Sequence, residues 1–527
     1  MPNLRHGDRL SWGDTVFLYL EREGMPLHIG SALQFDGVIS SDALRRFMDS
    51  KLPLIPRYLQ RVVSPPFNIG LPTWEYDPDF DLRNHIREVT LKRGTNAEYK
   101  AVTGRIFSQL MDRTRPLWDL TLVRGLRGNR TGLIFRIHHC LADGIAGVGL
   151  MNVIMDANPA APPLPRKKRK MHVPVQRDPL ASVLEGLLSS YSNIVERILT
   201  SQADVLSIAE RVAAGSREWP SGELARLLPE ITAPTQPLRF NIPCRGPQKV
   251  AWVKLPLADI KAIKAKYGTS VNDVLLALVT STVRRYVEMH SDPTEKQLLR
   301  MMVPVNVRGN GAADELGNRI SLLPFTVPLD IRNPRRLLSA VHERTEFLKQ
   351  AHVAEIVGLA AGLIGVIATP LQALAGPVAS QLPIAPFNLV CTNVPGPQVP
   401  LYLMGHKMLS WYPYVPVGGE MALNCAMLSY NGTVFLGFSG DVHAAPDLRR
   451  LESMLQLSFA ELRGAARIGP PQKKRFRAKM TKAVKKVSSE PVAAVSPAIP
   501  ARSVETFPPS APNAARDHIV DSLSAAD

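Results

Sequence analysis

Residues 131–150 read Thr-Gly-Leu-Ile-Phe-Arg-Ile-His-His-Cys-Leu-Ala-Asp-Gly-Ile-Ala-Gly-Val-Gly-Leu. The apolar run 133–137 is typical of a buried strand, and it ends at the doublet His138-His139. Successive side chains of a strand point to opposite faces, so the two imidazoles cannot both serve one site. By this alternation His139 shares a face with Phe135, and His138 lies on the other face.

A histidine at the end of a strand can act as a catalytic residue. A neutral imidazole with a carboxylate nearby is suited to act as general base on an alcohol or a thiol near pH 7. Asp143 and Gly144 follow the doublet, and the small residues after them can begin a helix. The alternative is that both histidines are structural and precede a turn. On the residues alone, both interpretations stay open.

Length and charge set limits on the whole chain. Its 527 residues exceed the usual single domain, so two domains of roughly 150–250 residues are expected. The hydrophobic content of 45% allows a sizeable core. The formal net charge of +17 predicts an anionic partner, which is a membrane surface, a nucleic acid or a phosphorylated substrate.

The cysteine pattern argues against a disulfide framework or a zinc site. The chain has four cysteines, far apart and without Cys-x-x-Cys spacing, which is typical of a reducing cytosol. The first 14 residues carry charges and lack an apolar segment, so no signal peptide is expected. Residues 356–387 are uncharged, but their stretch without proline is shorter than the roughly 20 residues of a membrane span. We expect a buried or interfacial helix there.

Helices and strands alternate along the chain, which indicates an α/β protein. The first half, residues 1–157, carries the histidine doublet. Residues 158–235 are a proline-flanked basic linker and then a helical crossover, because apolar residues recur there at helical spacing. The second half is 236–469. The tail, 470–527, is basic at first and then rich in Ser, Pro and Ala, so we expect it to be disordered.

A strongly periodic helix follows Ser270 in the second half. Ser270 is a candidate N-cap, and Asp273 lies three residues later, as in a capping box. Asn272 and Asp273 are therefore expected in the first turn of this helix.

The basic blocks of the linker and tail leave several interpretations open. They can attract anionic lipid at about 1 kcal/mol per residue near the surface. They can also be a nuclear-type signal, contact nucleic acid, or form a solvated loop. Aromatic content is only 6%, and no aromatic platform lies among these charges, which disfavours nucleic acid.

Several blocks along residues 8–468 resemble the bacterial wax ester synthase / acyl-CoA:diacylglycerol acyltransferase family, part of the CoA-dependent acyltransferase superfamily. Residues 138–144 are similar to its catalytic signature, His-His-x-x-x-Asp-Gly. Further blocks match in the family's order: Pro116-Leu117-Trp118, 271–274, 303–308, 316–318 and 392–397. Blocks in the right order are more specific than any single one.

This resemblance implies two chloramphenicol-acetyltransferase-like halves with an active-site tunnel between them. His139 would remove the proton from an acceptor hydroxyl, which attacks the acyl-CoA thioester. His138 would brace the loop by hydrogen bonding, and Gly144 would allow the turn after the doublet. Asp143 would hold the loop by pairing with an arginine, for which Arg308 is the candidate.

The resemblance also assigns substrate-binding residues. Asn272, at a helix N-terminus, would support the oxyanion, or else it only braces the helix start. Asp273 and Arg308 are placed in the same substrate-binding set. The Pro116-Leu117-Trp118 block would shape the tunnel wall, with Trp118 as plain core as the alternative.

The expected function is an acyl-CoA-dependent O-acyltransferase that esterifies diacylglycerol or a long-chain fatty alcohol. It would need no cofactor and no metal, with acyl-CoA as a substrate. Its partners would be acyl-CoA, the lipid alcohol and an anionic membrane or lipid-inclusion surface, and nucleic acid is disfavoured. It would be cytoplasmic, at the inner membrane face or on lipid inclusions. The alternative is a lipid-binding or lipid-inclusion surface protein with little or no turnover.

Overall fold

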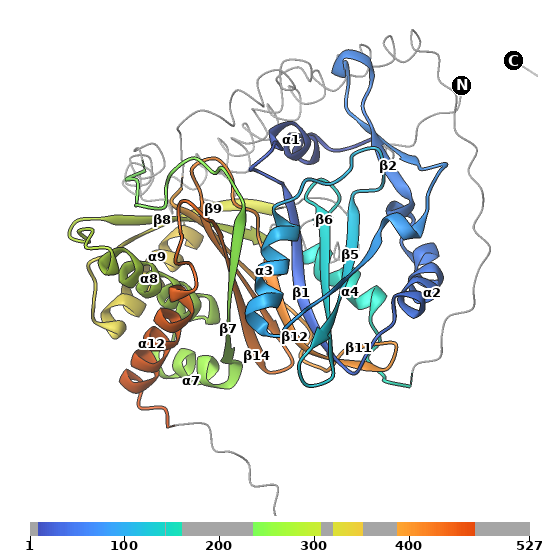
Figure 1. Ribbon diagram of the computed structural model, residues 1–527. Coiled ribbons are helices and arrows are strands. Elements are labelled where there is room, and N and C mark those ends of the chain that lie inside the picture. The colour runs from blue at the N-terminus through green and yellow to red at the C-terminus, as the bar shows by residue number, and fades with distance from the viewer. Residues whose placement is uncertain (1–8, 143, 161–234, 307–319, 351–386, 470–527) are drawn as a thin grey trace, which may run out of the picture. The chain divides into compact units, whose positions relative to one another are not determined.

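Two six-stranded sheets form the framework of the protein in a computed structural model (Figure 1). The structure describes residues 9–142, 144–160, 235–306, 320–350 and 387–469. The chain divides into two compact units, 1–470 and 471–527, and all described residues belong to the first. The linker block, most of the crossover, the tail and most of the uncharged stretch 356–387 lie outside the described residues.

The first sheet has the strand order β11-β12-β1-β6-β5-β4. Its central strand β6 is the predicted apolar run, and the prediction of a buried strand is confirmed. Strands β1 and β5 pair with β6 on either side, both antiparallel. The bounds are β1 (His28–Asp36), β4 (Ile86–Thr90), β5 (Trp118–Leu126), β6 (Arg130–His138), β11 (Tyr402–Leu403) and β12 (His406–Tyr414).

Two of these strands come from the second half of the chain. Strand β12 pairs antiparallel with β1, so that Tyr414 lies opposite Gly30. The segment 402–414 therefore leaves its own half and completes the sheet of the first half. The expected halves, 1–157 and 236–469, share a sheet as a result.

The second sheet has the order β7-β14-β13-β10-β8-β9. It mixes antiparallel pairs with parallel pairing of β10 to β8 and to β13. The bounds are β7 (Gln248–Pro256), β8 (Leu298–Asn306), β9 (Ile320–Pro328), β10 (Leu389–Pro395), β13 (Leu423–Tyr430) and β14 (Thr433–Asp441). A separate pair, β2 (Gln60–Val63) and β3 (Thr73–Tyr76), lies apart from both sheets.

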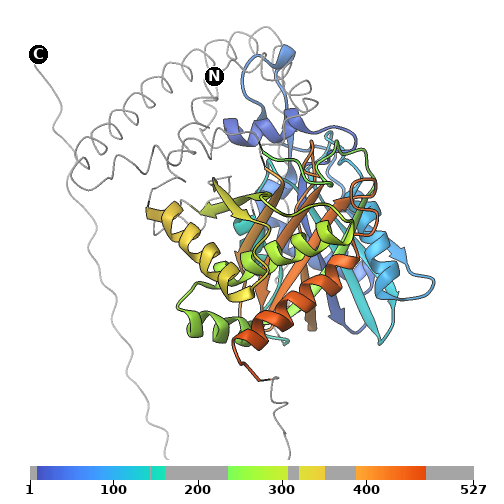
Figure 2. The same ribbon diagram turned by 90° about the vertical axis from the view of Figure 1, so that its left-hand side faces the viewer.

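Helices of the second half gather beside the second sheet (Figure 2). They are α7 (Leu257–Tyr267), α8 (Val271–Met289), α9 (Pro334–Gln350) and α12 (Arg450–Ala465). Helix α8 begins with the predicted capping box, since Ser270 accepts from the backbone N–H of Asp273 and the Asp273 side chain accepts from that of Ser270. The apolar side of α8 is buried in the same core as strands β8, β9 and β13.

The first sheet is covered on both faces. Leu44 and Met48 of α2 (Ser41–Lys51) share one core with Phe35 and Phe135. Helix α4 (Gly144–Ile154) contributes to that core, and α1 (Trp12–Leu20) lies near the end of β6. Short 3₁₀ turns connect these parts: η2 (Leu52–Leu54), η3 (Pro56–Leu59), η4 (Pro66–Asn68) and η5 (Leu82–Asn84).

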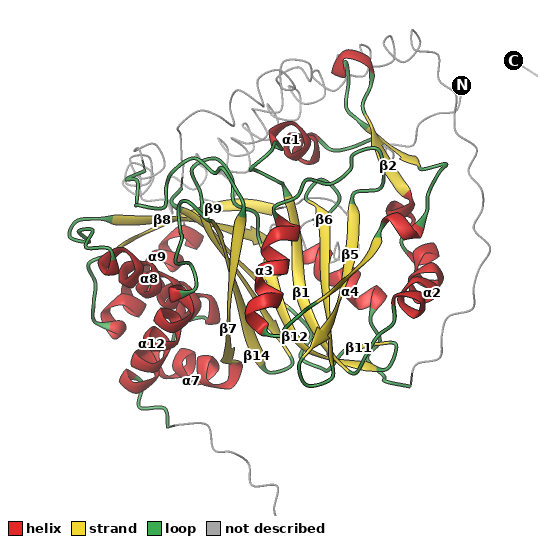
Figure 3. Ribbon diagram, in the orientation of Figure 1, coloured by secondary structure: helices red, strands yellow, loops and turns green. Residues whose placement is uncertain are grey.

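Helix α3 (Asn96–Phe107) covers the other face and joins the two halves. It packs against β5 and β6 and also against β7 of the second sheet. At Gly104 a Cβ atom would lie 2.6 Å from the carbonyl oxygen of Gln248, so only glycine allows this approach. Figure 3 shows the strands of both sheets between flanking helices. Among the described helices, none combines the length and apolar character that crossing a bilayer requires.

Candidate active site

A cavity of about 290 Å³ lies between the two sheets, and His139 forms part of its wall. Phe135 and Ile137 line the same cavity, so the predicted alternation along β6 is confirmed. The backbone N–H of His139 donates to the carbonyl of Leu27 at 3.0 Å, which ties the residue after β6 to the segment before β1. His139 therefore sits where the first sheet faces the second.

The cavity wall is mostly apolar and comes from both halves. The first sheet contributes residues of β1, β6 and β12, the second contributes residues of β8, β10 and β13, and α4 supplies three. The lining residues besides His139 are Ile29, Gly30, Ser31, Phe135, Ile137, Gly147, Val148, Met151, Pro304, Thr392, Asn393, Val394, Pro395, Trp411, Pro413, Tyr414, Val415, Ala426, Met427 and Leu428. Such a wall suits a hydrocarbon chain beside one imidazole.

The ring of His139 is held by an aromatic partner. Phe17 of α1 stacks on it with ring centroids 4.0 Å apart and an interplanar angle of 6°. The N-cap Ser11, whose hydroxyl accepts from the N–H of Asp14, begins the helix that presents Phe17. Phe17 therefore restricts the orientation of the imidazole at the cavity.

His138 points away from the cavity into the interior. Its Nδ1 accepts a hydrogen bond from the backbone N–H of Cys140 at 3.2 Å, and its carbonyl accepts from Leu141 at 2.9 Å. Its Nε2 lies 3.4 Å from Oε1 of Glu21. These contacts hold the turn that follows β6, which places His138 in the geometry of a brace.

The sequence does not single out Glu21. Its side chain is only 1% exposed. It accepts hydrogen bonds from the N–H of Leu27 at 3.0 Å and from Nη2 of Arg113 at 2.9 Å. Burial alone would raise the pKa of Glu21, but the hydrogen bonds and charges of His138 and Arg113 outweigh it and lower the pKa to about 2. No spacing rule links residues 21 and 138, so only the fold reveals this contact.

A second buried charge lies on the His138 face of β6. Arg136 donates from Nε to Oδ1 of Asp119 at 2.9 Å and from Nη1 to the carbonyls of Ile106 and Gln109. His28 pairs with His138 across the ladder of β1 and β6. Burial, and then the charge of Arg136, lowers the pKa of His28 well below its usual value, which favours the neutral form of this imidazole.

The structure describes only part of the predicted signature loop. Gly144 is the first residue of α4, whose Gly147, Val148 and Met151 line the cavity. Asp143 and Arg308 lie outside the described residues, and so does their expected pairing.

The Pro116-Leu117-Trp118 block lies beside the end of β6, where Trp118 of β5 is opposite Ile137, and none of its three residues lines the cavity. The carbonyl of Leu117 accepts from the N–H of His138 at 3.0 Å. Trp118 is 2% exposed and stacks on Tyr58 and His85, with centroids 4.8 Å and 4.6 Å away. Its side chain belongs to the core of the first half, which was the alternative considered for it.

Asn272 does not line the cavity but contacts a residue that does. Its Oδ1 accepts from Nδ2 of Asn393 at 3.3 Å, and Asn393 lines the cavity from the end of β10. The amide of Asn272 can therefore orient the amide of Asn393.

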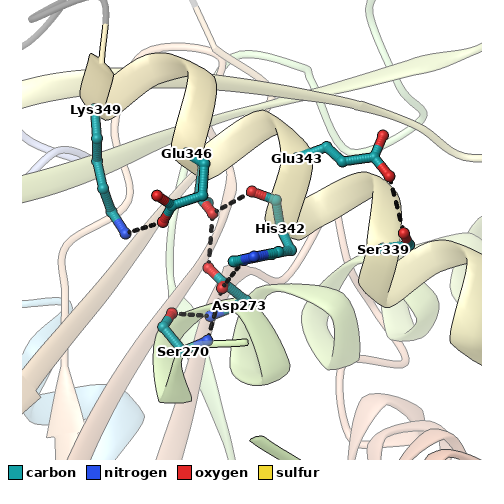
Figure 4. Close-up of polar contacts among 8 residues, drawn as sticks. Ser270, Asp273, Ser339, His342, Glu343, Glu346 and Lys349 are labelled. Carbon is teal, nitrogen blue, oxygen red and sulfur yellow. Dashed lines mark hydrogen bonds and ion pairs between the residues drawn. The ribbon is translucent and has the colours of Figure 1, made fainter. Parts of the chain in front are cut away.

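Asp273 faces α9 and does not line the cavity (Figure 4). Its carboxylate accepts from the N–H of Ser270, from Oγ1 of Thr345 and from Nδ1 of His342, each at 2.8 Å. Burial raises the pKa of Asp273, but these hydrogen bonds prevail and lower it. Asp273 therefore anchors the start of α8 to α9.

Comparison with known proteins shows which family has this sequence and this fold. The family model "Wax ester synthase/diacylglycerol acyltransferase catalytic domain" matches residues 10–275, and "WS/DGAT C-terminal domain" matches 316–463. The probable diacylglycerol O-acyltransferase tgs1 of Mycobacterium tuberculosis is 28% identical over 459 residues, which cover 84% of this chain and 94% of that protein. For tgs2 of the same organism the identity is 25%, with 88% and 100% covered.

Solved structures show the same fold. The wax ester synthase/diacylglycerol acyltransferase from Marinobacter aquaeolei VT8 superposes with a TM-score of 0.60 at 24% identity, covering 87% of this chain and 100% of that one. The first condensation domain of the calcium-dependent antibiotic synthetase gives a TM-score of 0.52 at 16% identity and covers 88% and 97%. The prediction of an α/β fold with two sheet-rich halves is confirmed. The chain belongs to the wax ester synthase/diacylglycerol acyltransferase family and is an acyltransferase.

Proposed function

We propose that this acyltransferase moves the acyl group of acyl-CoA to the hydroxyl of a lipid alcohol, either diacylglycerol or a long-chain fatty alcohol. The observation that carries the proposal is the place of His139, a single imidazole on the wall of a largely apolar cavity between the two sheets. The mycobacterial relatives, named as probable diacylglycerol O-acyltransferases, and the Marinobacter wax ester synthase/diacylglycerol acyltransferase support the substrate class.

His139 acts as general base in this reaction. Its imidazole takes the proton of the alcohol as the oxygen attacks the thioester carbonyl, and a tetrahedral oxyanion forms. When the intermediate collapses, the carbon–sulfur bond breaks, the ester forms, and the imidazolium returns its proton to the CoA thiolate. The acyl group arrives as an activated thioester, so the reaction needs neither a metal nor a further cofactor.

The surrounding residues position these groups. The Phe17 ring fixes the plane of the His139 imidazole. Asn272 supports the oxyanion through Asn393, because the bond between the two amides leaves the second N–H of Asn393 for the cavity. Glu21 and His138 hold the turn from which His139 projects. Asp143 and Arg308 complete the loop by pairing.

A CoA-release assay with a panel of acceptors tests the proposal. Hexadecanol, diacylglycerol, a sterol and short alcohols are each offered with a long-chain acyl-CoA, and ester is followed as the second product. His139→Ala should lower turnover by a factor of about 10² to 10⁴, since it removes the general base. His443→Ala is the matched control, because its side chain is exposed and does not line the cavity.

Two results would contradict the proposal. Wild-type turnover in His139→Ala would remove the histidine from the chemistry. Lipid binding without CoA release for any acceptor would instead identify a lipid-binding protein.

A further inference from the structure

A second cavity, of about 350 Å³, lies along the junction of the two halves. Its wall comes from β1, α3 and β6 of the first half and from β7, β12 and α12 of the second. Its polar lining includes Gln34, Asn96, Lys100, Arg130, Lys254 and Ser410. It shares no lining residue with the cavity at His139.

The second cavity lies far from His139 along the first sheet, although Trp411 of the first cavity stands between Ser410 and Tyr412 of the second on β12. Gln34 pairs with Gly132, seven positions before His139 in the chain. A strand rises about 3.4 Å per residue, so the separation along β6 is roughly 24 Å. A ligand in the second cavity would not contact the imidazole of His139.

The charge of the second cavity is positive. Lys100, Arg130 and Lys254 line it, and none of the described lining residues is acidic. Lys100 is neutralised by an ion pair with Glu452. Arg130 and Lys254 are exposed, and within the part of the chain that the structure describes neither forms an ion pair. Two positive charges therefore line this cavity without an ion-pair partner among the described residues.

A buried hydroxyl also lacks a partner here. Ser410 is 6% exposed, lines the cavity, and its Oγ forms no hydrogen bond to any described residue. Buried hydroxyl groups are normally hydrogen-bonded, because leaving one unpaired costs free energy. Its cross-strand neighbour Gln34 donates its amide to Asn96 at 3.3 Å, so that amide proton is already used. The Ser410 hydroxyl is therefore a buried donor and acceptor with no described partner, in a residue that lines the same cavity as Arg130 and Lys254.

We propose that this cavity binds a phosphate group of a small anionic ligand. A phosphate dianion matches the charges of Arg130 and Lys254, and the planar guanidinium fork of arginine can donate to two of its oxygens at once. The hydroxyl of Ser410 provides a third, neutral contact. This site lies apart from the catalytic cavity, and its binding of phosphate does not depend on which alcohol is the acyl acceptor.

Bound phosphate would link the two halves. Arg130 begins β6 of the first half, whereas Lys254 lies in β7 of the second. A ligand that binds only the folded protein stabilises it by RT ln(1 + [L]/Kd), which keeps rising with ligand concentration after the site is filled. Pyrophosphate should therefore raise the unfolding temperature of the full-length protein, and the rise should continue with the logarithm of its concentration above Kd.

The test measures pyrophosphate binding by isothermal titration at constant ionic strength, with thermal unfolding as a second readout. Arg130→Ala and Lys254→Ala should each weaken binding about tenfold, the loss expected for one charge-assisted hydrogen bond. Ser410→Ala should weaken it by less. The double variant Arg130→Ala/Lys254→Ala is compared with a control double variant, Lys261→Ala/Lys264→Ala. Both control residues are exposed lysines of α7 outside the cavity. Turnover of acyl-CoA confirms that each variant is folded.

The binding measurements decide whether the second cavity is a phosphate site. Loss of binding in the Arg130/Lys254 double variant but not in the control supports the site. Equal affinity in wild type and double variant, or equal loss in the control, overturns it. A parallel titration with phosphatidic acid vesicles identifies the source of the phosphate: binding that requires Arg130 and Lys254 there indicates a lipid headgroup, and binding of pyrophosphate alone indicates a soluble ligand.

Discussion

Oε1 of Glu21 lies 3.4 Å from Nε2 of His138, and neither side chain is more than 1% exposed. The same Glu21 carboxylate accepts from the N–H of Leu27, whose carbonyl accepts from the N–H of His139. One buried carboxylate thus holds both sides of the turn that presents His139. A small shift of this turn would displace the imidazole from its substrate, so Glu21 is a positioning residue.

Replacing Glu21 should separate its structural role from its effect on catalysis. Glu21→Ala leaves the buried side chain of His138 and the N–H of Leu27 without their acceptor and should lower the free energy of unfolding by about 3–5 kcal/mol. Glu21→Gln keeps the volume and should remain folded, with kcat about tenfold lower and KM changed less. Steady-state kinetics and denaturant unfolding measure both.

Glu23→Gln is the control for these variants, because Glu23 is exposed and two residues away. It should resemble the wild type in both measurements. Wild-type kcat in Glu21→Gln would show that the Glu21 charge has no part in placing His139.

The stability of the protein should depend on pH through Glu21. Its pKa is about 2 in the folded protein, against 4.5 for the unperturbed group. A lowered pKa stabilises the folded state above the unfolded value, and this contribution is lost as the pH falls from about 4.5 through about 2. The loss amounts to about 3 kcal/mol. Denaturant unfolding between pH 7 and 2 should show it in the wild type, with a shallower acid slope in Glu21→Gln; identical slopes would contradict it.

The neighbours Asn272 and Asp273 should behave differently when each is replaced by alanine. Asp273→Ala removes a buried carboxylate that binds Ser270, Thr345 and His342, and should lower the free energy of unfolding by about 3 kcal/mol. Asn272→Ala removes the partner of Asn393 and should lower kcat about tenfold with little loss of stability. Kinetics and thermal unfolding of the two variants together make the comparison.

The opposite pattern would reassign these residues. A fall in kcat for Asp273→Ala at unchanged stability would place Asp273 at the substrate. An unstable Asn272→Ala with normal kcat would make Asn272 a brace for the start of α8.

Removal of the tail should weaken membrane association. Residues 470–486 carry eight basic residues and no acidic one, and they lie outside the described residues. Anionic lipid attracts such a segment by about 1 kcal/mol per residue near the surface, an attraction that salt screens. Deletion of 470–527 should reduce sedimentation with anionic vesicles at low salt and leave turnover of dispersed substrate unchanged. Equal sedimentation of both proteins would exclude the tail as the membrane contact.

The features that sequence predicted correctly depend on neighbours along the chain. The apolar run before His138 specified a buried strand, and the two-residue period of a strand placed His139 on the face of Phe135 and Ile137. The capping box of Ser270 and Asp273 spans three residues. In each case the interacting atoms are close because the chain is locally helical or extended, whatever the rest of the fold does.

The contacts that complete the site join residues far apart in the chain. Glu21 and His138 meet only because α1 packs at the end of β6, and Tyr414 reaches Gly30 only because β12 crosses into the first sheet. Trp118 matched a family block, yet burial against Tyr58 and His85 decided its place.

By itself, the sequence determined the strand, the face of His139, the helix start at Ser270 and the family. Only the tertiary structure decided which carboxylate holds the doublet, which amide stands between Asn272 and the cavity, and where unpaired charges gather. The physical reason is range: hydrogen-bonding geometry and side-chain period act within a few residues, whereas burial and electrostatics act between whatever residues the packing of the two sheets brings together.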